Sequence, residues 1–445
     1  MIKPVLDQEF IPAVVYNSEF MKTADQPVSF AIERENGLVY RYDTKIGPDA
    51  DKNNFYSERL IKTLLWAVGG FKIFISGSKE VYEYIKGCYT AGGLREFDVD
   101  FMSRVYEHPF EVVFCEDDVP AANDNPVAVG RHLDGCRIGF DAGGSDMKVS
   151  AVVNGEVVHS EEIVWLPKLN DNPDYHYENI RKAIKVAADK MERVDAIGVS
   201  SAGVYVNNRA MVASLFIKIP RDQFDAKIKD IYLNIGKEYG VPVTVANDGD
   251  VAALAGSMCL NKNNVLGVAM GTSEAVGYVD HNGNITGWLN ELAFVPVDYN
   301  VDSMVDEWSG DFGCGVKYFS QDAVIKLAPK AGITLSDDLT LAEKLKEVQK
   351  LMEAGHEGAA KIFETIGVYF GYAIAYYAEF YDIDYMQILG RVTSGKGGDI
   401  IIDQAKSVLK AEFPELYAKV NLYIPDEYER RVGQSIAAAS LPNVK

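Results

Sequence analysis

One arrangement of apolar and polar residues occurs twice along this chain. It is found in RIGFDAGGSDMKVSAVVNGEVV at 137–158 and in VLGVAMGTSEAVGYVDHNGNIT at 265–286. Both segments contain an apolar run, a polar turn with glycine, a second apolar run and an Asn-Gly turn. Apolar runs bounded by turn residues predict buried strands, and Asn-Gly predicts a type I′ hairpin. The sequence therefore predicts a duplicated unit of three strands.

Strand and helix signals alternate through the chain after residue 136. Alternation of this kind favours parallel sheets with helices on their faces, so the pattern predicts an α/β fold. The expected strands are 195–200, 242–247 and 384–390, and the expected helices lie near 175–191, 222–239 and 355–380.

The first 130 residues carry separate signals for a small α/β module. Apolar residues flank an Asn-Gly pair at 36–37 as in a hairpin, and FKIFIS at 71–76 predicts a strand. Ser57 and Ser78 each precede a helical apolar pattern. Residues 117–131 are polar and hold two prolines, which is typical of a linker. The sequence has no pair of short helices with a basic second helix, so a DNA-binding helix-turn-helix is not expected here.

The composition and net charge of the chain exclude some classes of binding partner. The chain has 445 residues, 48% of them hydrophobic, with a formal net charge of −21 and a pI near 4.8. Such an acidic protein is not expected to bind nucleic acid or an anionic membrane surface. The longest apolar helical stretch, 359–381, holds three charged residues and is expected to be a core helix. The five cysteines are scattered and the N-terminus has no apolar leader, so a cytoplasmic protein without disulfides is expected.

The first polar turn has the composition of a phosphate-binding loop. Gly143 and Gly144 let bare backbone N–H groups approach an anion, with Ser145 and Lys148 beside them. Asp141, at the end of the preceding strand, is placed to hold a hydrated Mg²⁺. A tight hairpin with a capping Asp explains the same residues without a ligand.

Two later turns have related compositions. Gly271, Thr272 and Ser273 offer hydroxyl and N–H donors to phosphate oxygens. Gly390 and Arg391 open a turn suited to the adenosine portion of a nucleotide. Ordinary turns are the alternative at both places.

An Asn-Asp pair stands between a predicted strand and a predicted helix. Phosphoryl transfer to an alcohol uses a carboxylate that accepts the hydroxyl proton. Asp248 is the candidate for this role, and Asn247 would orient the same substrate. A helix cap is the alternative for Asp248. Glu274 is discordant, because a carboxylate repels a polyphosphate; it either points away from the second turn or contacts the magnesium shell.

Along the chain, a phosphate turn is followed by the Asn-Asp pair, a second phosphate turn and a late Gly-rich turn. This order resembles that of the actin-like sugar kinases, and among them the ROK family of repressors, open reading frames and kinases. The resemblance covers residues 136–445. It includes ITGWLNELAF at 285–294, which is similar to the family segment whose Glu, here Glu291, binds sugar hydroxyls. It implies a two-lobed actin-like ATPase fold of the ribonuclease H-like kind, with lobes at 136–250 and 251–445. The α/β module at 1–130 has no place in the minimal family pattern.

The resemblance also implies a use for each turn. ATP and Mg²⁺ are the expected cofactors and a sugar is the expected partner, with the lobes closing over them. Asp248 is the implied catalytic base, and Asp141 the water-mediated magnesium ligand. A homodimer is implied by the family alone. The substrate is expected at Asn247, Glu291 and Ser201, and ATP at Gly143, Gly144, Ser145, Lys148, Gly271, Thr272, Ser273, Gly390 and Arg391.

The substrate half departs from the family pattern. Phe294 stands where the family has a His that binds sugar and zinc, and Val316 stands where it has a second sugar-binding Glu. Ala213-Ser214 replaces a sugar-contacting Pro-Asn pair. In DEWSGDFGCGVKYFS only Cys314 remains of the zinc-binding cysteines. One cysteine cannot hold zinc in a four-ligand site, so no structural zinc is expected.

These observations predict an ATP- and Mg²⁺-dependent kinase for a sugar or sugar-like polyol. The competing prediction is a non-catalytic regulator that keeps the fold and binds sugar or nucleotide. The changes at Phe294 and Val316 favour the regulator, whereas Asp248 and the two phosphate turns favour the kinase. An ATPase of the filament or chaperone kind is a third alternative, in which Glu291 would have no function.

Overall fold

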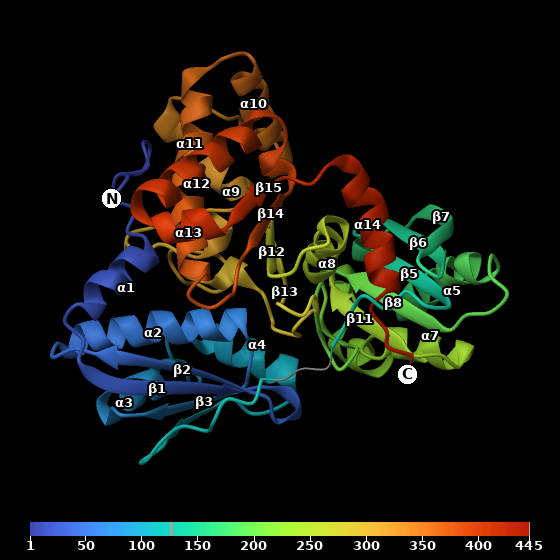
Figure 1. Cartoon of the computed structure of the whole chain (residues 1–445), viewed down its shortest axis with the longest axis horizontal. Coiled ribbons are helices and arrows are strands. Elements are labelled where there is room, and N and C mark those ends of the chain that lie inside the picture. Colours follow the sequence, from blue (N-terminus) through green and yellow to red (C-terminus); the bar gives the residue numbers. More distant parts are fainter. Residues whose placement is uncertain (125–127, 445) are drawn as a thin grey trace. The chain divides into compact units, whose positions relative to one another are not determined.

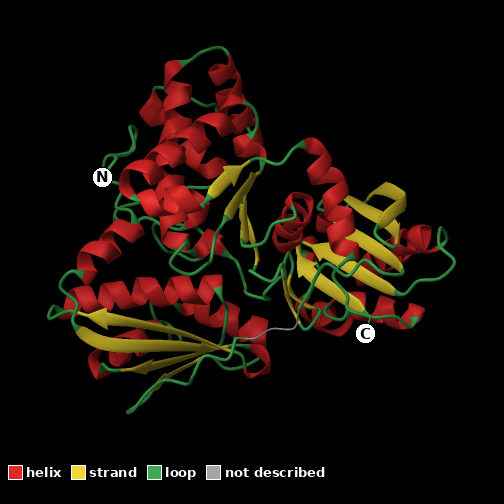
Figure 2. Cartoon of the chain, in the orientation of Figure 1, coloured by secondary structure: helices red, strands yellow, loops and turns green. Residues whose placement is uncertain are grey.

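The computed structural model describes residues 1–124 and 128–444, without the side chains of 427–432, and divides into two compact units (Figure 1). Unit 1 comprises residues 1–125, 268–276 and 288–424. Unit 2 comprises residues 126–267, 277–287 and 425–445. Residues 125–127 of the predicted linker lie outside the described part of the chain. Figure 2 shows helices beside strands in both units, as an α/β fold requires.

The N-terminal part of unit 1 is a four-stranded sheet with helices. Its elements are α1 (Ala13–Met21), β1 (Gln26–Glu33), β2 (Val39–Ile46), α2 (Ala50–Ala67), β3 (Lys72–Ser76), α3 (Lys79–Cys88), α4 (Glu96–Tyr106) and β4 (Glu111–Phe114). The strand order is β2-β1-β3-β4, in which β1 is antiparallel to both neighbours and β4 is parallel to β3. Figure 1 shows α2 running along this sheet.

The predicted hairpin, the strand at 71–76 and the helix after Ser78 are confirmed, and one helix start is corrected. The hairpin β1–β2 turns at Asn36, whose φ is 59°, and the side chain of Ser78 caps α3. Helix α2 begins earlier than predicted, because Asp49 and not Ser57 caps it. Ser57 is buried within the helix. The first turns of α2 are polar, so the apolar periodicity that predicts a helix becomes visible only after them.

The remainder of unit 1 has a second sheet with the order β13-β12-β14-β15. Helices α11 and α12 pack side by side (Figure 1). The predicted helix near 355–380 and the strand at 384–390 are confirmed as α11 and β14. None of the described helices is long and apolar enough to cross a membrane. The elements are β12 (Val265–Met270), β13 (Glu274–Val279), α9 (Gln321–Leu327), α10 (Leu341–Glu353), α11 (Glu357–Tyr377), β14 (Tyr385–Leu389), α12 (Lys396–Glu412), α13 (Pro414–Lys419) and β15 (Asn421–Tyr423).

Unit 2 is built on a five-stranded sheet with the order β11-β8-β5-β6-β7. Its elements are β5 (Cys136–Ala142), β6 (Asp146–Val153), β7 (Glu156–Val164), α5 (Pro173–Ala188), β8 (Ala196–Ser201), β9 (Val204–Val206), β10 (Arg209–Val212), α6 (Arg221–Gln223), α7 (Ile231–Tyr239), β11 (Val243–Asn247), α8 (Asp248–Leu260) and α14 (Glu427–Ala439). Strands β5, β8 and β11 are parallel, whereas β6 and β7 continue β5 as antiparallel hairpins. The apolar core holds side chains of the sheet together with those of α5 and α7.

The duplicated pattern is confirmed for the first copy and corrected for the second. Strands β5, β6 and β7 are the three predicted strands. In the second copy β12 and β13 form, but Ile285 makes only isolated bridges and no third strand among the described residues. The helix predicted near 222–239 is also interrupted, since a π-helical turn at Phe224–Ile228 separates α6 from α7. Buried apolar residues continue through that turn, so the sequence pattern alone does not reveal the break.

Candidate functional site

The carboxyl ends of three parallel strands in unit 2 gather predicted site residues. On β5 and β8, Asp141 is in register with Ser200, and on β8 and β11, Ser201 is in register with Asn247. Asp248 follows as the first residue of α8. In open α/β sheets, ligands bind outside the carboxyl ends of the strands. This edge of the sheet is therefore the candidate site of unit 2.

The two acidic side chains at this edge have raised pKa values. Burial raises the pKa of Asp141 to about 6; the Ser200 hydroxyl, which donates to Asp141 Oδ1 at 2.7 Å, opposes that shift and the charge of Asp248 adds to it. Burial also raises the pKa of Asp248, while the N–H of Gly249, 3.1 Å from its Oδ1, opposes the shift. Two neighbouring acids of this kind suit a bound cation or the acceptance of a proton.

Asn247 and Ser201 are both engaged within the protein. Asn247 caps α8, because its Oδ1 accepts the N–H two residues further on at 2.8 Å, and its Nδ2 donates to Gly203 O at 2.8 Å. Ser201 is fully buried, and its Oγ accepts the hydroxyls of Tyr205 at 2.6 Å and Tyr232 at 3.1 Å. The Ser201 oxygen is therefore the acceptor for two tyrosines that sequence reasoning did not identify.

The first polar turn is a tight hairpin, and the side chain of Trp165 stabilises its backbone. The N–H of Gly143 donates to Asp146 O at 2.9 Å, and the indole N–H of Trp165 donates to Gly143 O at 2.8 Å. A Cβ on Gly143 would stand 2.7 Å from Asp146 O, so the hairpin itself requires glycine there. Ser145 Oγ donates to Asp146 Oδ1 at 2.8 Å.

A lysine that sequence reasoning missed lies over this turn. Lys168 belongs to a short 3₁₀ turn after β7, and a Cβ on Gly144 would stand 3.7 Å from its Nζ. Its side chain is exposed and forms no ion pair within the described residues. Lys148, in contrast, has its Nζ 4.0 Å from Asp146 Oδ2. No sequence spacing links residue 168 to residue 144, because only the return of the chain along β7 brings them together.

In unit 1, the two other predicted turns lie at the ends of adjacent strands. Strands β12 and β14 are neighbours in the sheet. Gly390 follows β14 with a φ of 101° and packs on the backbone of Met270, where any Cβ would collide. The turn 271–273 is closed by the N–H of its first residue, which donates to the carbonyl of its last at 2.9 Å. Its two hydroxyl side chains, like that of Arg391, are exposed.

Glu274 points into the interior of unit 1 and away from this turn. It is 3% exposed, its Oε1 accepts the Tyr377 hydroxyl at 3.4 Å, and its Oε2 has no hydrogen-bond partner within the described residues. Burial raises the pKa of Glu274 to about 8; the bond from Tyr377 opposes the shift and the charge of Glu291 adds to it. Glu274 is therefore mostly neutral at pH 7, so it would not repel a phosphate bound at this turn.

Glu291 lies within the segment 285–294, which the sequence predicts to contact the substrate. It precedes the 3₁₀ turn Leu292–Phe294, and its N–H donates to Trp66 O at 2.9 Å. The ring centroid of Phe294 lies 4.2 Å from that of Trp66. The side chain that stands where the family has a His thus packs on an aromatic residue of the N-terminal part.

The described part of the chain offers no clustered metal ligands. It contains no group of three or more His, Cys, Asp or Glu side chains arranged to hold a metal ion. Cys314 is buried, and its Sγ lies 3.8 Å from Ser309 Oγ. The absence of a structural zinc remains a prediction from the sequence.

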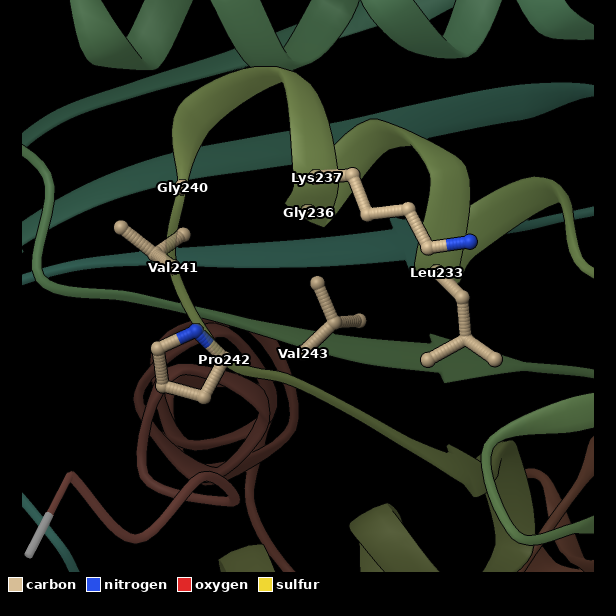
Figure 3. Close-up of a pocket in the computed structure, with 7 residues that line it drawn as sticks. All are labelled: Leu233, Gly236, Lys237, Gly240, Val241, Pro242 and Val243. Carbon is tan, nitrogen blue, oxygen red and sulfur yellow. The ribbon is translucent and has the colours of Figure 1, made fainter.

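An open pocket in unit 2 lies apart from these residues. It is formed by Leu233, Gly236, Lys237, Gly240, Val241, Pro242 and Val243 (Figure 3). These residues belong to α7, to the turn after it and to the start of β11, the opposite end of that strand from Asn247. Its charged group, the Nζ of Lys237, donates to Asn234 Oδ1 at 3.2 Å. The pocket contains none of the predicted site residues.

Comparison with known proteins identifies the family. The model of the ROK family matches residues 137–421. No curated protein matches the chain in sequence. Similar solved structures include a ROK family transcriptional regulator described as a homologue of the E. coli MLC protein, with 16% identity, a TM-score of 0.54, and coverage of 69% of this chain and 78% of that one.

Two similar structures are sugar kinases. The ROK hexokinase from Thermus thermophilus has 17% identity, a TM-score of 0.53, and coverage of 68% of this chain and 97% of that one. The glucokinase from Parabacteroides distasonis has 16% identity, a TM-score of 0.51, and coverage of 68% and 96%. At these identities the likeness shows the fold, which is that of the actin-like ATPases. Because the family match extends over more than half of its residues, this chain belongs to the ROK family.

Proposed function

We propose that this protein transfers a phosphoryl group from ATP to a hydroxyl of a sugar or sugar-like polyol. The observation that carries the proposal is the alignment of Asp141 and Asp248 at the carboxyl edge of β5-β8-β11, next to the Gly143-Gly144 turn. Membership of a family with sugar kinases among its structures supports the same class of reaction.

Asp248 is the proposed general base. As the substrate oxygen bonds to the γ-phosphorus and the bond from phosphorus to the ADP oxygen breaks, the carboxylate accepts the hydroxyl proton. Burial raises its pKa and so makes it a better proton acceptor than an exposed aspartate. Asn247, held through both ends of its amide, fixes the start of the helix that carries this base.

Asp141 is the proposed position for magnesium. Mg²⁺ is usually bound through one or two carboxylates and keeps several waters, so a site with few protein ligands suits it. The raised pKa of Asp141 beside Asp248 fits a bound cation, which would remove the repulsion between the two carboxylates. When bound, the ion supplies charge neutralisation for the phosphates, and Ser200 orients the carboxylate that holds it.

The phosphate and nucleotide contacts are proposed within each unit separately. Unit 2 supplies backbone N–H groups and cations, and unit 1 supplies a second phosphate turn and the adenosine turn. In unit 2 these residues are Gly143, Gly144, Ser145, Lys148 and Lys168. In unit 1 they are Gly271, Thr272, Ser273, Gly390 and Arg391, with Glu291 as the substrate contact.

A non-catalytic regulator is the second candidate function. The packing of Phe294 on Trp66 favours it, because the substrate segment there presents an apolar ring where the family has a polar contact. One of the similar structures is a transcriptional regulator, which agrees with this alternative. Retention of Asp248 at the strand edge favours the kinase.

The test is a coupled ADP-release assay with ATP, Mg²⁺ and a panel of hexoses, amino sugars and polyols. We expect turnover with at least one acceptor, a phosphorylated product by mass spectrometry, and little ADP without acceptor. Asp248→Ala should abolish the signal, whereas Asp189→Asn, at an exposed carboxylate on the far end of α5, should not change it. Sugar or ATP binding by calorimetry without turnover on any acceptor would instead identify a regulator.

A further inference from the structure

The end of helix α2 holds the backbone of the substrate segment. The last carbonyls of a helix have no partner within the helix and are open to other donors. Here the N–H groups of Leu289, Asn290 and Glu291 donate to the carbonyls of Val68, Ala67 and Trp66 at 3.1, 2.9 and 2.9 Å. Three consecutive residues that end at Glu291 are therefore fixed to the N-terminal part of the chain, residues 1–125.

Aromatic side chains extend this contact. The ring of Phe294 lies 4.2 Å from Trp66 and 5.6 Å from Phe97, measured between centroids. Phe97 is on α4 and is only partly buried, while Trp66 is fully buried and its indole N–H donates to Asp98 Oδ1 at 3.1 Å. Rings at such distances stabilise one relative orientation.

A buried cluster of charges fixes Asp311, in the loop that follows the segment 289–295. Asp311 accepts two hydrogen bonds from the guanidinium of Arg59, at 3.0 and 3.1 Å, and lies 3.0 Å from Arg95 and 3.2 Å from Lys62. Glu58 pairs with both arginines and Asp98 with Lys62, so three cations face three anions, all at most 4% exposed. Displacing Asp311 would take a partner from three buried cations, so the cluster favours one position for this loop.

The loop returns to the substrate segment. The N–H of Gly315 donates to Val295 O at 2.9 Å, and a Cβ on Gly315 would collide with Glu274 Oε2. The segment from 289 to 295 is thus held at its start by α2 and at its end by a loop that the charges of α2 and α4 fix. All of these contacts lie within unit 1.

We infer that residues 1–125 position Glu291 for the acceptor and so help to determine which acceptor is used. Trp66 and Phe97 are the positioning residues, and they act through the backbone of 289–291 and the ring of Phe294. This inference rests on the proposed kinase function.

The experiment compares Phe97→Ala with Phe97→Tyr, which keeps the ring, and with Phe114→Ala. Phe114 is a partly buried ring on β4 that packs on Tyr82, so its loss is a matched change elsewhere in the N-terminal part. Loss of the ring contact between Phe97 and Phe294, of about 1 kcal/mol, should raise the KM for the acceptor about fivefold. The KM for ATP should not change, and Phe97→Tyr and Phe114→Ala should behave as the wild type.

Two results would overturn the inference. One is an unchanged KM for the acceptor in Phe97→Ala; the other is an equal change in both KM values and in kcat, which a general structural role would produce. If the wild type phosphorylates no acceptor, the proposed function fails and amide hydrogen exchange decides the positioning role. Faster exchange at 289–291 in Phe97→Ala, but not in Phe114→Ala, supports it, and equal exchange in both overturns it.

Discussion

Two pairs of acidic side chains differ in what surrounds them. Asp141 and Asp248 in unit 2 lie at strand ends, where a serine hydroxyl and a backbone N–H donate to their carboxylates. Glu274 in unit 1, whose pKa the charge of Glu291 helps to raise, accepts only a long bond from Tyr377 and leaves one oxygen without a partner within the described residues.

Because of this difference, the carboxyl groups of Asp141 and Glu274 have different protonation states at neutral pH. The pKa of Asp141 is about 6, whereas that of Glu274 is about 8. Environments that separate pKa values in this way separate roles, as in enzymes that use one ionised and one neutral carboxyl group. Under the proposed function, the unit 2 pair would supply charge and proton acceptance, and Glu274 would be a neutral group behind the second turn.

The largest effect should come from replacing the base by its amide. Asp248→Asn keeps the shape of the side chain but cannot accept a proton, so kcat should fall by about 10²–10⁴-fold. Affinity for ATP, measured by calorimetry, should change little, because the proton is transferred only in the chemical step. Glu274→Gln, the same change at the other pair, is the matched control; equal losses of kcat in both variants would contradict the distinction.

The next largest effect is expected for the proposed magnesium position. Asp141→Asn removes the charge that would hold the ion through water, and apparent Mg²⁺ affinity should weaken by about 10–100-fold. Activity as a function of Mg²⁺ concentration measures this, with Asp189→Asn as the control. In the wild type, protonation competes with the metal, so apparent affinity should fall as the pH drops below about 6. An unchanged Mg²⁺ dependence in Asp141→Asn would exclude this residue as the ligand.

The first pair could be found from sequence because its signals are local. Asp141 and Asn247-Asp248 each follow an apolar run that ends in a turn or a helix start, and parallel strands place such ends at one edge. The three-strand unit of the first copy follows from the same signals. Helix bounds were less accurate where polar residues begin a helix, as in α2.

The protonation state of Glu274, in the second pair, could not be predicted from the sequence, because it depends on residues far away along the chain. Glu274 is kept neutral by its burial, among residues as distant in sequence as Tyr377, 103 positions away. The contact of Phe294 with Trp66 and that of Lys168 with the Gly144 turn also depend on the folded chain, and no spacing announces them. Burial and long-range packing therefore account for most of what sequence reasoning missed.

Lys168 offers a smaller test of the charged surroundings of the first pair. Lys168→Ala removes an exposed cation over the Gly144 turn, and the KM for ATP should rise about tenfold, which corresponds to about 1.4 kcal/mol. The effect should shrink as salt is added, because exposed charges are screened. Lys190→Ala, at an exposed lysine that follows α5, is the control. A KM for ATP that is the same in both variants would remove Lys168 from the phosphate contacts.

The smallest effect on turnover at pH 7 is expected for Glu274→Gln, since the wild-type side chain is already mostly neutral there. Its consequence lies in stability. In the unfolded chain Glu274 releases its proton near its ordinary pKa of 4.5, whereas in the folded protein it keeps that proton up to about pH 8. The unfolded state therefore binds fewer protons in this window, and stability falls as the pH rises through it. Glutamine cannot titrate, so the wild-type Tm should fall relative to that of the variant by calorimetry between pH 5 and 9. A constant Tm difference would mean that Glu274 is ionised in the folded protein, and the contrast between the two pairs would then be lost.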